Sequence, residues 1–269
     1  MFHGEVTPYP IPERVFELCK IVADTPANIR EIREKIEPSL LNVSDTAYFG
    51  HILTAAKELH LIDESSDQIL SYIGDRQILR TIGAFRRYCN SVVYPDSNTQ
   101  FYQITRFILD SNLDLIKLGN LTDQKVQDKM KRNTNIETVK AEQLRGIRFW
   151  LSFLGFGLIH GINTFTFLPN MYTALKDFLV MAKPKVKQEY TVAEFCDLIM
   201  PFAHVALHNA KEKHQFNYAM SAALRMMHDN KELQMKRIPD SSEIWNLYRQ
   251  DDHVLISEIS HIIVLKEVR

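Results

Sequence analysis

Cysteine is scarce in this sequence. Cys19, Cys89 and Cys196 are the only three among 269 residues, and no two of them form a CxxC pair. An odd number of widely spaced cysteines argues against a disulfide framework and against a zinc knuckle. Each of the three lies in an apolar, helix-like pattern. We therefore expect buried, reduced thiols, which suits a cytoplasmic protein.

An excess of positive charge is also lacking. The chain has 32 Lys and Arg against 33 Asp and Glu, so its formal net charge is -1. This balance excludes a histone-like protein that binds nucleic acid through bulk charge, and any nucleic-acid site must be a local patch. The most apolar stretch, residues 149–168, is interrupted by glycine, histidine and asparagine, so we expect no membrane span. Residues 1–5 lack the pattern of a signal peptide.

Several motifs of enzyme chemistry are absent. The sequence contains no GxxxxGKS or GxxxxGKT loop for a nucleotide phosphate, no GxGxxG and no GxSxG nucleophile turn. His204 and His208 are four residues apart on an expected helix, but Val205 follows His204 and the HExxH zinc pattern is missing. A structural or surface histidine pair is the favoured interpretation. We expect no catalytic residue, no metal and no cofactor.

A short pattern appears near both ends of the chain. Residues 48–62 and residues 216–238 each resemble an aromatic-headed helix with small residues in its middle, followed by a short strand and a polar turn. A winged helix-turn-helix has this order, because alanine lets its third helix pack closely and the strand and turn build the wing. We expect a mainly α fold with small β-hairpin wings, built from tandem winged helix-turn-helix units.

Apolar periodicity and helix breakers predict four parts of the chain. The basic, proline-broken segment 183–187 is the expected linker before the last of them. The parts are an N-terminal winged helix at 1–74, a helical connector at 75–135, a central winged-helix-like unit at 136–182 and a C-terminal winged-helix-like unit at 188–269.

Cations are concentrated between residues 76 and 148, which makes this region the expected surface for weak binding of duplex DNA phosphates. Some lie on a helix expected over residues 75–90, and others on a helix expected over residues 137–154. The expected nucleic-acid-binding residues are Arg76, Arg80, Arg86, Arg87, Lys140, Arg145 and Arg148. The alternative interpretation is a set of solvated helix faces, because scattered cations are common there.

The third helix of the N-terminal unit would be the reading helix of a helix-turn-helix, but its composition favours protein contact. Asp45 and Glu58 offset Lys57 and repel phosphate, whereas base-reading helices usually carry Arg, Lys, Asn or Gln. Tyr48 and His51 suit a protein interface with an aromatic anchor, so they are the expected protein-contact residues.

Asp240 and Glu258 suggest an alternative from another class, a metal-dependent nuclease that holds Mg²⁺ beside the scissile phosphate. Such sites usually place a lysine near the second acid, and Ser260 stands there instead. A wing turn and a strand with one outward acid explain these residues better. We therefore expect no cleavage of DNA.

The apolar stretch carries a family resemblance. It reads RFWLSFLGFG at residues 148–157 and FLPN at 167–170, and an apolar helix follows. We expect its aromatic side chains to pack in the core, with Trp150 partly exposed. The pattern resembles the tandem winged-helix accessory proteins of bacterial DNA-modification and restriction clusters, in particular the DpdG-like proteins of 7-deazaguanine DNA modification. Membership implies a role in an antiviral or restriction complex and transfers no catalytic residue.

The leading hypothesis is therefore a non-catalytic DNA-binding or adaptor subunit of a prokaryotic DNA-defence or DNA-processing complex. Its partners would be duplex DNA, bound weakly through a local basic patch, and other protein subunits. Two alternatives remain open at this point. One is the nuclease based on Asp240 and Glu258, and the other is a pure protein-interaction scaffold that binds no nucleic acid.

Overall fold

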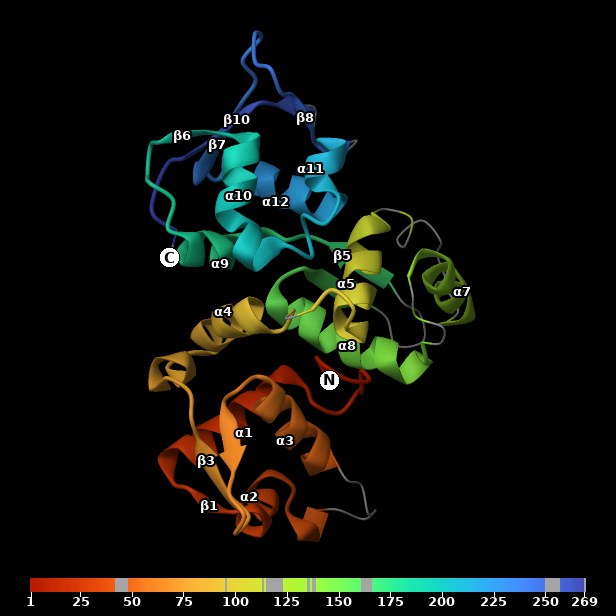
Figure 1. Cartoon of the computed structure of the whole chain (residues 1–269), viewed down its shortest axis with the longest axis vertical. Helices are drawn as coiled ribbons and strands as arrows, with labels where there is room; N and C mark the ends of the chain where they lie inside the picture. Colours follow the sequence, from red (N-terminus) through yellow and green to blue (C-terminus); the bar gives the residue numbers. More distant parts are fainter. Residues whose placement is uncertain are drawn as a thin grey trace. The chain divides into compact units, whose positions relative to one another are not determined.

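The computed structural model describes most of the chain (Figure 1). The described residues are 1–41, 48–94, 96–112, 114, 123–134, 136, 139–160, 166–249 and 257–268. They are mainly helical with small antiparallel sheets, which confirms the expected fold class at this level. They form two compact units: unit 1 comprises residues 1–102 and 138–153, and unit 2 comprises residues 103–137 and 154–269. In the described part, no helix is both long and apolar enough to cross a lipid bilayer.

Unit 1 is built around a three-stranded antiparallel sheet in which β3 lies between β1 and β2. Leu70 of β3 pairs with Ala27 on one side and with Glu64 on the other. Helix α5 (Gln100–Asp110) begins in unit 1 and continues into unit 2. The other elements are α1 (Pro12–Asp24), β1 (Ala27–Asn28), α2 (Ile29–Ile36), the 3₁₀ helix η1 (Ser39–Leu41), α3 (Tyr48–Glu58), β2 (Ile62–Glu64), β3 (Ile69–Tyr72), the 3₁₀ helix η2 (Arg76–Leu79), α4 (Ile82–Val92) and α8 (Ala141–Leu154).

The core of unit 1 follows the apolar periodicity of its helices. Proline at the first position starts α1, because its fixed φ suits a helix and its missing N–H would have no partner there. Val15, Leu18, Cys19 and Val22 form the fully buried face of α1, and α3, whose Ala55 and Ala56 are buried, packs against α1. The cap of α2 is Asn28, whose side chain accepts a hydrogen bond from the Arg30 N–H.

The helix expected over residues 75–90 is interrupted. Thr81 has an extended backbone, and its hydroxyl accepts a hydrogen bond from the Ala84 N–H at 3.0 Å. A threonine in this geometry is a helix N-cap, because its side chain satisfies a backbone donor that lacks a partner within the helix. The chain therefore forms η2 before Thr81 and α4 after it. Arg76 and Arg80 consequently do not lie on the same helix as Arg86 and Arg87.

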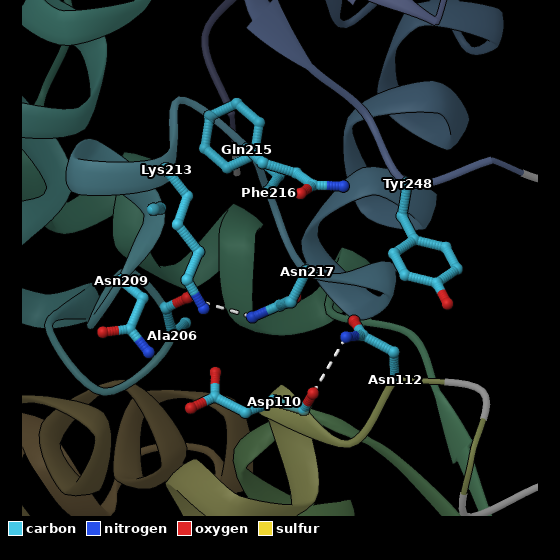
Figure 2. A pocket seen from close by; sticks show the side chains of 10 residues that line it. Asp110, Asn112, Ala206, Asn209, Lys213, Gln215, Phe216, Asn217 and Tyr248 are labelled. Carbon is cyan, nitrogen blue, oxygen red and sulfur yellow. Dashed lines mark hydrogen bonds between the residues drawn. The ribbon is translucent and has the colours of Figure 1, made fainter.

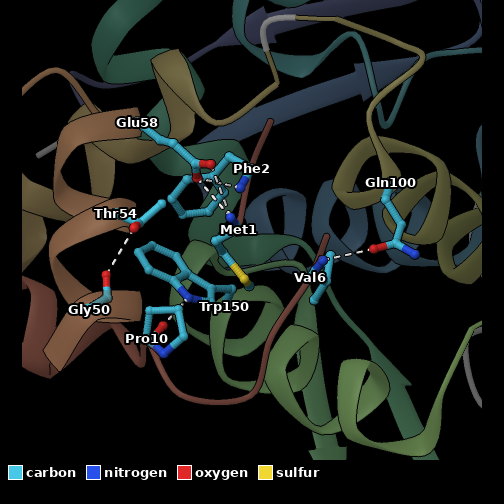
Figure 3. Close-up of polar contacts among 9 residues, drawn as sticks. All are labelled: Met1, Phe2, Val6, Pro10, Gly50, Thr54, Glu58, Gln100 and Trp150. Carbon is cyan, nitrogen blue, oxygen red and sulfur yellow. Dashed lines mark hydrogen bonds and ion pairs between the residues drawn. The ribbon is translucent and has the colours of Figure 1, made fainter. Parts of the chain in front are cut away.

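The first residues of the chain pack into unit 1 (Figure 3). The Phe2 ring meets the Trp150 ring of α8 edge to face, with centroids 4.7 Å apart. The Trp150 indole N–H donates to the Pro10 carbonyl at 2.6 Å. The Met1 ammonium group lies 2.9 Å from a carboxylate oxygen of Glu58 at the end of α3. Trp150 is fully buried, which corrects the expectation that it is partly exposed.

Unit 2 contains a second three-stranded antiparallel sheet, in which β10 lies between β6 and β7. Two smaller two-stranded sheets pair β4 with β5 and β8 with β9. Besides most of α5, the elements are α7 (Asp123–Asn133), β4 (Gly157–His160), β5 (Thr166–Pro169), α9 (Tyr172–Ala182), β6 (Glu189–Thr191), α10 (Val192–Ala203), α11 (Ala210–Lys213), α12 (Tyr218–Asp229), β7 (Leu233–Lys236), β8 (Trp245–Asn246), β9 (Glu258–Ile259) and β10 (His261–Val264).

One order of elements occurs in both units. Unit 1 runs α1, β1, α2, α3, β2, β3, with η1 between α2 and α3. Unit 2 runs α9, β6, α10, α12, β7, β10, with α11 inserted before α12 and with β8 and β9 inserted between β7 and β10. In both sheets the last strand lies between the other two. Helix α9 packs against α10 and α12 and so belongs with the C-terminal elements, although the sequence analysis grouped it with residues 136–182.

The C-terminal part contains local interactions that start α10 and allow α12 to pack closely. Thr191 and Glu194 form a capping box at the start of α10, with each side chain accepting from the other residue's backbone N–H. The small residues of α12 are buried and let it pack closely on α9. Cys19, Cys89 and Cys196 are buried and form no disulfide, as predicted. Burial raises the pKa of the Cys196 thiol to about 12.

Candidate nucleic-acid interface

Six of the seven predicted cations have described side chains, and all six belong to unit 1. The side chain of Arg145 lies outside the described residues. Arg76 is exposed and donates from Nη2 to the Ala23 carbonyl at 2.8 Å. Arg80, also exposed, donates from Nη1 to Gln77 Oε1 at 3.1 Å. These contacts join the Arg76 guanidinium group to α1 and the Arg80 guanidinium group to η2.

The other four described cations come from α4 and from the region of α8. Arg86 and Arg87 are half-buried on α4. Lys140 Nζ lies 4.0 Å from Glu5 Oε1, and both side chains are mostly exposed, so this ion pair adds little stability. The Arg148 guanidinium lies over the Phe149 ring, 5.1 Å from its centroid. The structure therefore gathers the predicted cations into one unit but distributes them over three separate segments.

Helix α3 offers a limited surface. Gly50 and Thr54 are exposed, whereas Tyr48 and His51 are half-buried because the Tyr9 ring lies against both. The ring centroids are 4.7 Å apart for Tyr9 and Tyr48, and 4.8 Å apart for Tyr9 and His51. The two predicted protein-contact residues thus form an aromatic cluster with Tyr9.

The charge of α3 differs from the sequence-based expectation. The Glu58 side chain is only 15% exposed and is paired with the Met1 ammonium group, so it does not present an open negative charge. Lys57 pairs with Glu64 of β2 at 2.5 Å. Asp45 lies outside the described residues. The described charges of α3 are therefore neutralised within unit 1, and they repel phosphate less than the sequence suggested.

Helix α12 occupies the position in unit 2 that α3 occupies in unit 1, but its surface is almost fully covered. Residues 219–225 are buried, and neighbouring contacts come from α9, β7 and β5. Arg225, the one arginine of α12, is 2% exposed and donates from Nη1 to the Tyr248 carbonyl at 2.7 Å. Met226 is 39% exposed. The exposed residues of α12 are Met226 and Asp229, and neither is a cation that could contact phosphate.

The two acids of the nuclease alternative have other roles in unit 2. Glu258 Oε2 accepts a hydrogen bond from Arg237 Nε at 2.8 Å, and Asp240 is exposed in a turn. The buried Ser260 hydroxyl accepts from the Ile238 N–H at 2.9 Å. Within the described residues, no group of three potential metal ligands occurs. The expectation that DNA is not cleaved stays a prediction.

The histidine pair does not lie on one helix, because α10 ends at Ala203. His204 is the C-cap residue, and His208 lies in the following turn. His208 Nε2 is 3.3 Å from Arg106 Nη1. Burial lowers the pKa of His208, and the nearby Arg106 lowers it further. His208 is therefore neutral at pH 7, and its Nε2 accepts a hydrogen bond from Arg106.

A polar cavity in unit 2 was not anticipated from the sequence. Asp110 of α5 meets Asn209 and Lys213 from the segment around α11 (Figure 2), and Arg106 of α5 lines the same cavity. No local motif marks these residues, since about a hundred positions separate the two segments.

Comparisons with known proteins give no match. No family model fits the sequence, and no curated protein and no solved structure is significantly similar to the chain. The function must therefore be inferred from the residues themselves and from the order of the elements.

Proposed function

We propose that the chain is a non-catalytic DNA-binding and adaptor subunit of a cytoplasmic, prokaryotic DNA-defence or DNA-processing complex. The repeated order of elements carries this proposal. A winged helix has the order helix, strand, two helices and two strands, with the last strand central. Elements in this order, with η1 inserted in unit 1 and α11, β8 and β9 inserted in unit 2, support the proposal. Tandem winged helices are typical of proteins that hold nucleic acid and partner proteins together. The defence context rests on the resemblance to DpdG-like proteins.

We assign DNA contact to unit 1. All six predicted cations with described side chains belong to it. The mostly buried α12 argues against a similar role for the corresponding elements of unit 2. With a formal net charge of -1, binding must be weak and must depend on the local cations. Partner proteins would contact unit 1 through Tyr48 and His51 of α3.

The first test removes three cations of unit 1 together, Arg86→Gln, Arg87→Gln and Arg148→Gln. Removing a cation that neutralises one phosphate reduces the slope of log affinity against log salt by about 0.9, because fewer counterions are released. We expect the triple variant to bind duplex DNA more weakly at low salt and with a flatter salt dependence. Fluorescence anisotropy with a labelled duplex at several salt concentrations measures both quantities.

A matched control removes the same charge from unit 2. Lys183, Lys185 and Lys187 are exposed between α9 and β6, and their replacement with glutamine should leave DNA affinity nearly unchanged. Equally weakened binding in the two triple variants would show that affinity depends on total charge and not on unit 1. If the wild-type protein binds no duplex DNA at low salt, alone or with its partner, this result contradicts the DNA-binding proposal. It then favours a protein-interaction scaffold.

A second test concerns protein contact through α3. The double change Tyr48→Ala and His51→Ala removes the half-buried aromatic cluster beside Tyr9, but leaves the buried face of α3 intact. We expect less co-purification with a partner from the native host, and DNA affinity close to that of wild type. Thr54→Ala on the exposed side of α3 is the control. Loss of sequence-selective DNA binding with the partner retained would instead make α3 a base-reading helix.

A further inference from the structure

The polar cavity beside Arg106 in unit 2 has a volume of about 430 Å³. A volume in this range is typical of small-molecule sites. Three cations line it, together with two acids and several uncharged polar groups. The charged lining residues are Arg106, Lys129, Lys213, Asp110 and Asp114. Lys129 pairs with Asp114 at 3.4 Å, so the cations that remain to attract an anion are Arg106 and Lys213.

The Arg106 guanidinium is held in place before any ligand arrives. Nη1 lies 3.3 Å from His208 Nε2, and Nη2 donates to the Asn133 carbonyl at 3.1 Å. Arginine has five N–H donors in a rigid fork, so these two contacts leave further donors for a ligand. Because His208 is neutral, it orients the guanidinium without adding charge. A preoriented arginine is well suited to bind phosphate oxygens.

A smaller cavity of about 110 Å³ adjoins the first, since both are lined by Asp110, Asn209 and Lys213 (Figure 2). Its remaining wall is rich in side-chain amides and also contains two aromatic rings. These residues are Asn112, Gln215, Asn217, Phe216 and Tyr248. The Asn112 and Asn217 amides are already bonded to backbone groups, and the Phe216 ring is buried. The exposed Gln215 amide and the half-buried Tyr248 ring remain for a nucleobase, whose edge needs hydrogen bonds and whose face can stack on an aromatic ring.

Asp110 lies at the junction of the two cavities. Desolvation by the surrounding protein raises the pKa of its carboxyl group, although His208, Arg106 and Lys213 lower it. A carboxylate at this position accepts hydrogen bonds from hydroxyl groups, as acidic residues do with ribose in dinucleotide sites. Arg106 lines only the larger cavity, Gln215 and Tyr248 line only the smaller one, and Asp110 and Lys213 line both.

We propose that the joined cavities bind a free mononucleotide. The phosphate lies at Arg106 and Lys213, the sugar hydroxyl groups donate to Asp110, and the base meets Gln215 and Tyr248. This site is a small-molecule site in unit 2 and does not depend on DNA binding by unit 1. It gives the proposed adaptor a means to sense a nucleotide.

The test is calorimetric titration of the full chain with AMP, GMP, CMP and UMP, and with adenosine and inorganic phosphate as truncated probes. We expect at least one mononucleotide to bind at least tenfold more tightly than either truncated probe. Lys213→Gln should weaken that binding at least tenfold, because the exposed Lys213 serves the phosphate. Arg106→Gln should also weaken mononucleotide binding at least tenfold, provided that the circular dichroism spectrum of this variant matches that of the wild type.

The control variant is Lys211→Gln on the same helix, α11. Lys211 pairs with Asp197 and does not line either cavity, so its replacement should leave nucleotide affinity unchanged. Tyr248→Ala should weaken nucleotide binding several-fold and leave the weak binding of phosphate as it is. This pattern separates the base end of the site from its phosphate end.

Three outcomes would overturn the proposal. If none of the four mononucleotides binds, the cavities are not a nucleotide site. If inorganic phosphate binds as tightly as the best mononucleotide, the site takes a simple anion. If a 5′-phosphorylated oligonucleotide binds and is weakened by Lys213→Gln while free nucleotides do not bind, the ligand is a nucleic-acid end. None of these results depends on whether Arg86, Arg87 and Arg148 contribute to duplex binding.

Discussion

Trp150→Ala is expected to lower the free energy of unfolding by about 3–5 kcal/mol, the usual cost of removing a buried aromatic side chain. Trp150 is fully buried in unit 1, and its indole N–H donates to the Pro10 carbonyl. Its ring also meets Phe2 and Phe153 edge to face. The alanine variant would leave a large cavity between α8 and the N-terminal segment. Chemical denaturation followed by circular dichroism measures the change.

The neighbouring residue provides the control. Phe149 is on the same helix but is 40% exposed, so Phe149→Ala should cost less than about 1 kcal/mol. Its main described contact is with Arg148, and such an exposed cation–π contact contributes only about 0.5–1 kcal/mol. Equal destabilisation by the two variants would contradict the placement of α8 against the first residues of the chain.

Gly146→Ala is expected to destabilise unit 1 by about 1–3 kcal/mol or more, because overpacking against an atom that cannot move is costly. A Cβ atom at Gly146 would lie 2.2 Å from the Thr7 carbonyl oxygen and 2.9 Å from Pro8 Cα. Both neighbours are backbone atoms, so the N-terminal segment or α8 would have to shift. Thermal and chemical denaturation of the variant measure the decrease in stability.

Gly50→Ala is the matched control, because it makes the same change inside another helix of unit 1. No atom lies within 4 Å of a Cβ built at Gly50, which is exposed on α3. Alanine loses less backbone entropy than glycine on forming a helix, so this variant should gain about 0.5–1 kcal/mol. We therefore expect Gly146→Ala to lower the free energy of unfolding and Gly50→Ala to raise it. A gain in stability from Gly146→Ala would show that α8 does not approach residues 7 and 8.

Much of the secondary structure could be predicted because its causes are local. The buried face of α1 repeats with the helical period, and the Thr191–Glu194 capping box is a signal within four residues. Thr81 shows the limit of this reasoning. The periodicity of residues 75–90 continues across Thr81, but the threonine hydroxyl bonds to the Ala84 N–H and starts a new helix. The apolar periodicity favours one continuous helix, whereas the Thr81 side chain favours a helix start at that residue. The sequence pattern does not show which of these two preferences is stronger.

The candidate sites were predicted less completely. The sequence located seven candidate cations between residues 76 and 148, and the structure places the six with described side chains in unit 1. It also singled out Tyr48 and His51, but not Tyr9, which lies against both from about forty positions earlier in the chain. Glu58 was expected to expose its charge and is instead paired with the Met1 ammonium group. Each difference comes from a residue distant in the sequence.

By itself, the sequence determined the mainly helical fold, the buried thiols and the pattern of helix, strand and turn near each end. These properties follow from composition and from contacts between near neighbours. Only the tertiary structure decided that short strands such as β1 and β6 pair with β3 and β10, because two or three residues are too few to show a period. It also decided that Arg106 meets His208, 102 residues later in the chain. A polar cavity formed by such distant residues has no local pattern, since each lining side chain alone resembles an ordinary surface residue.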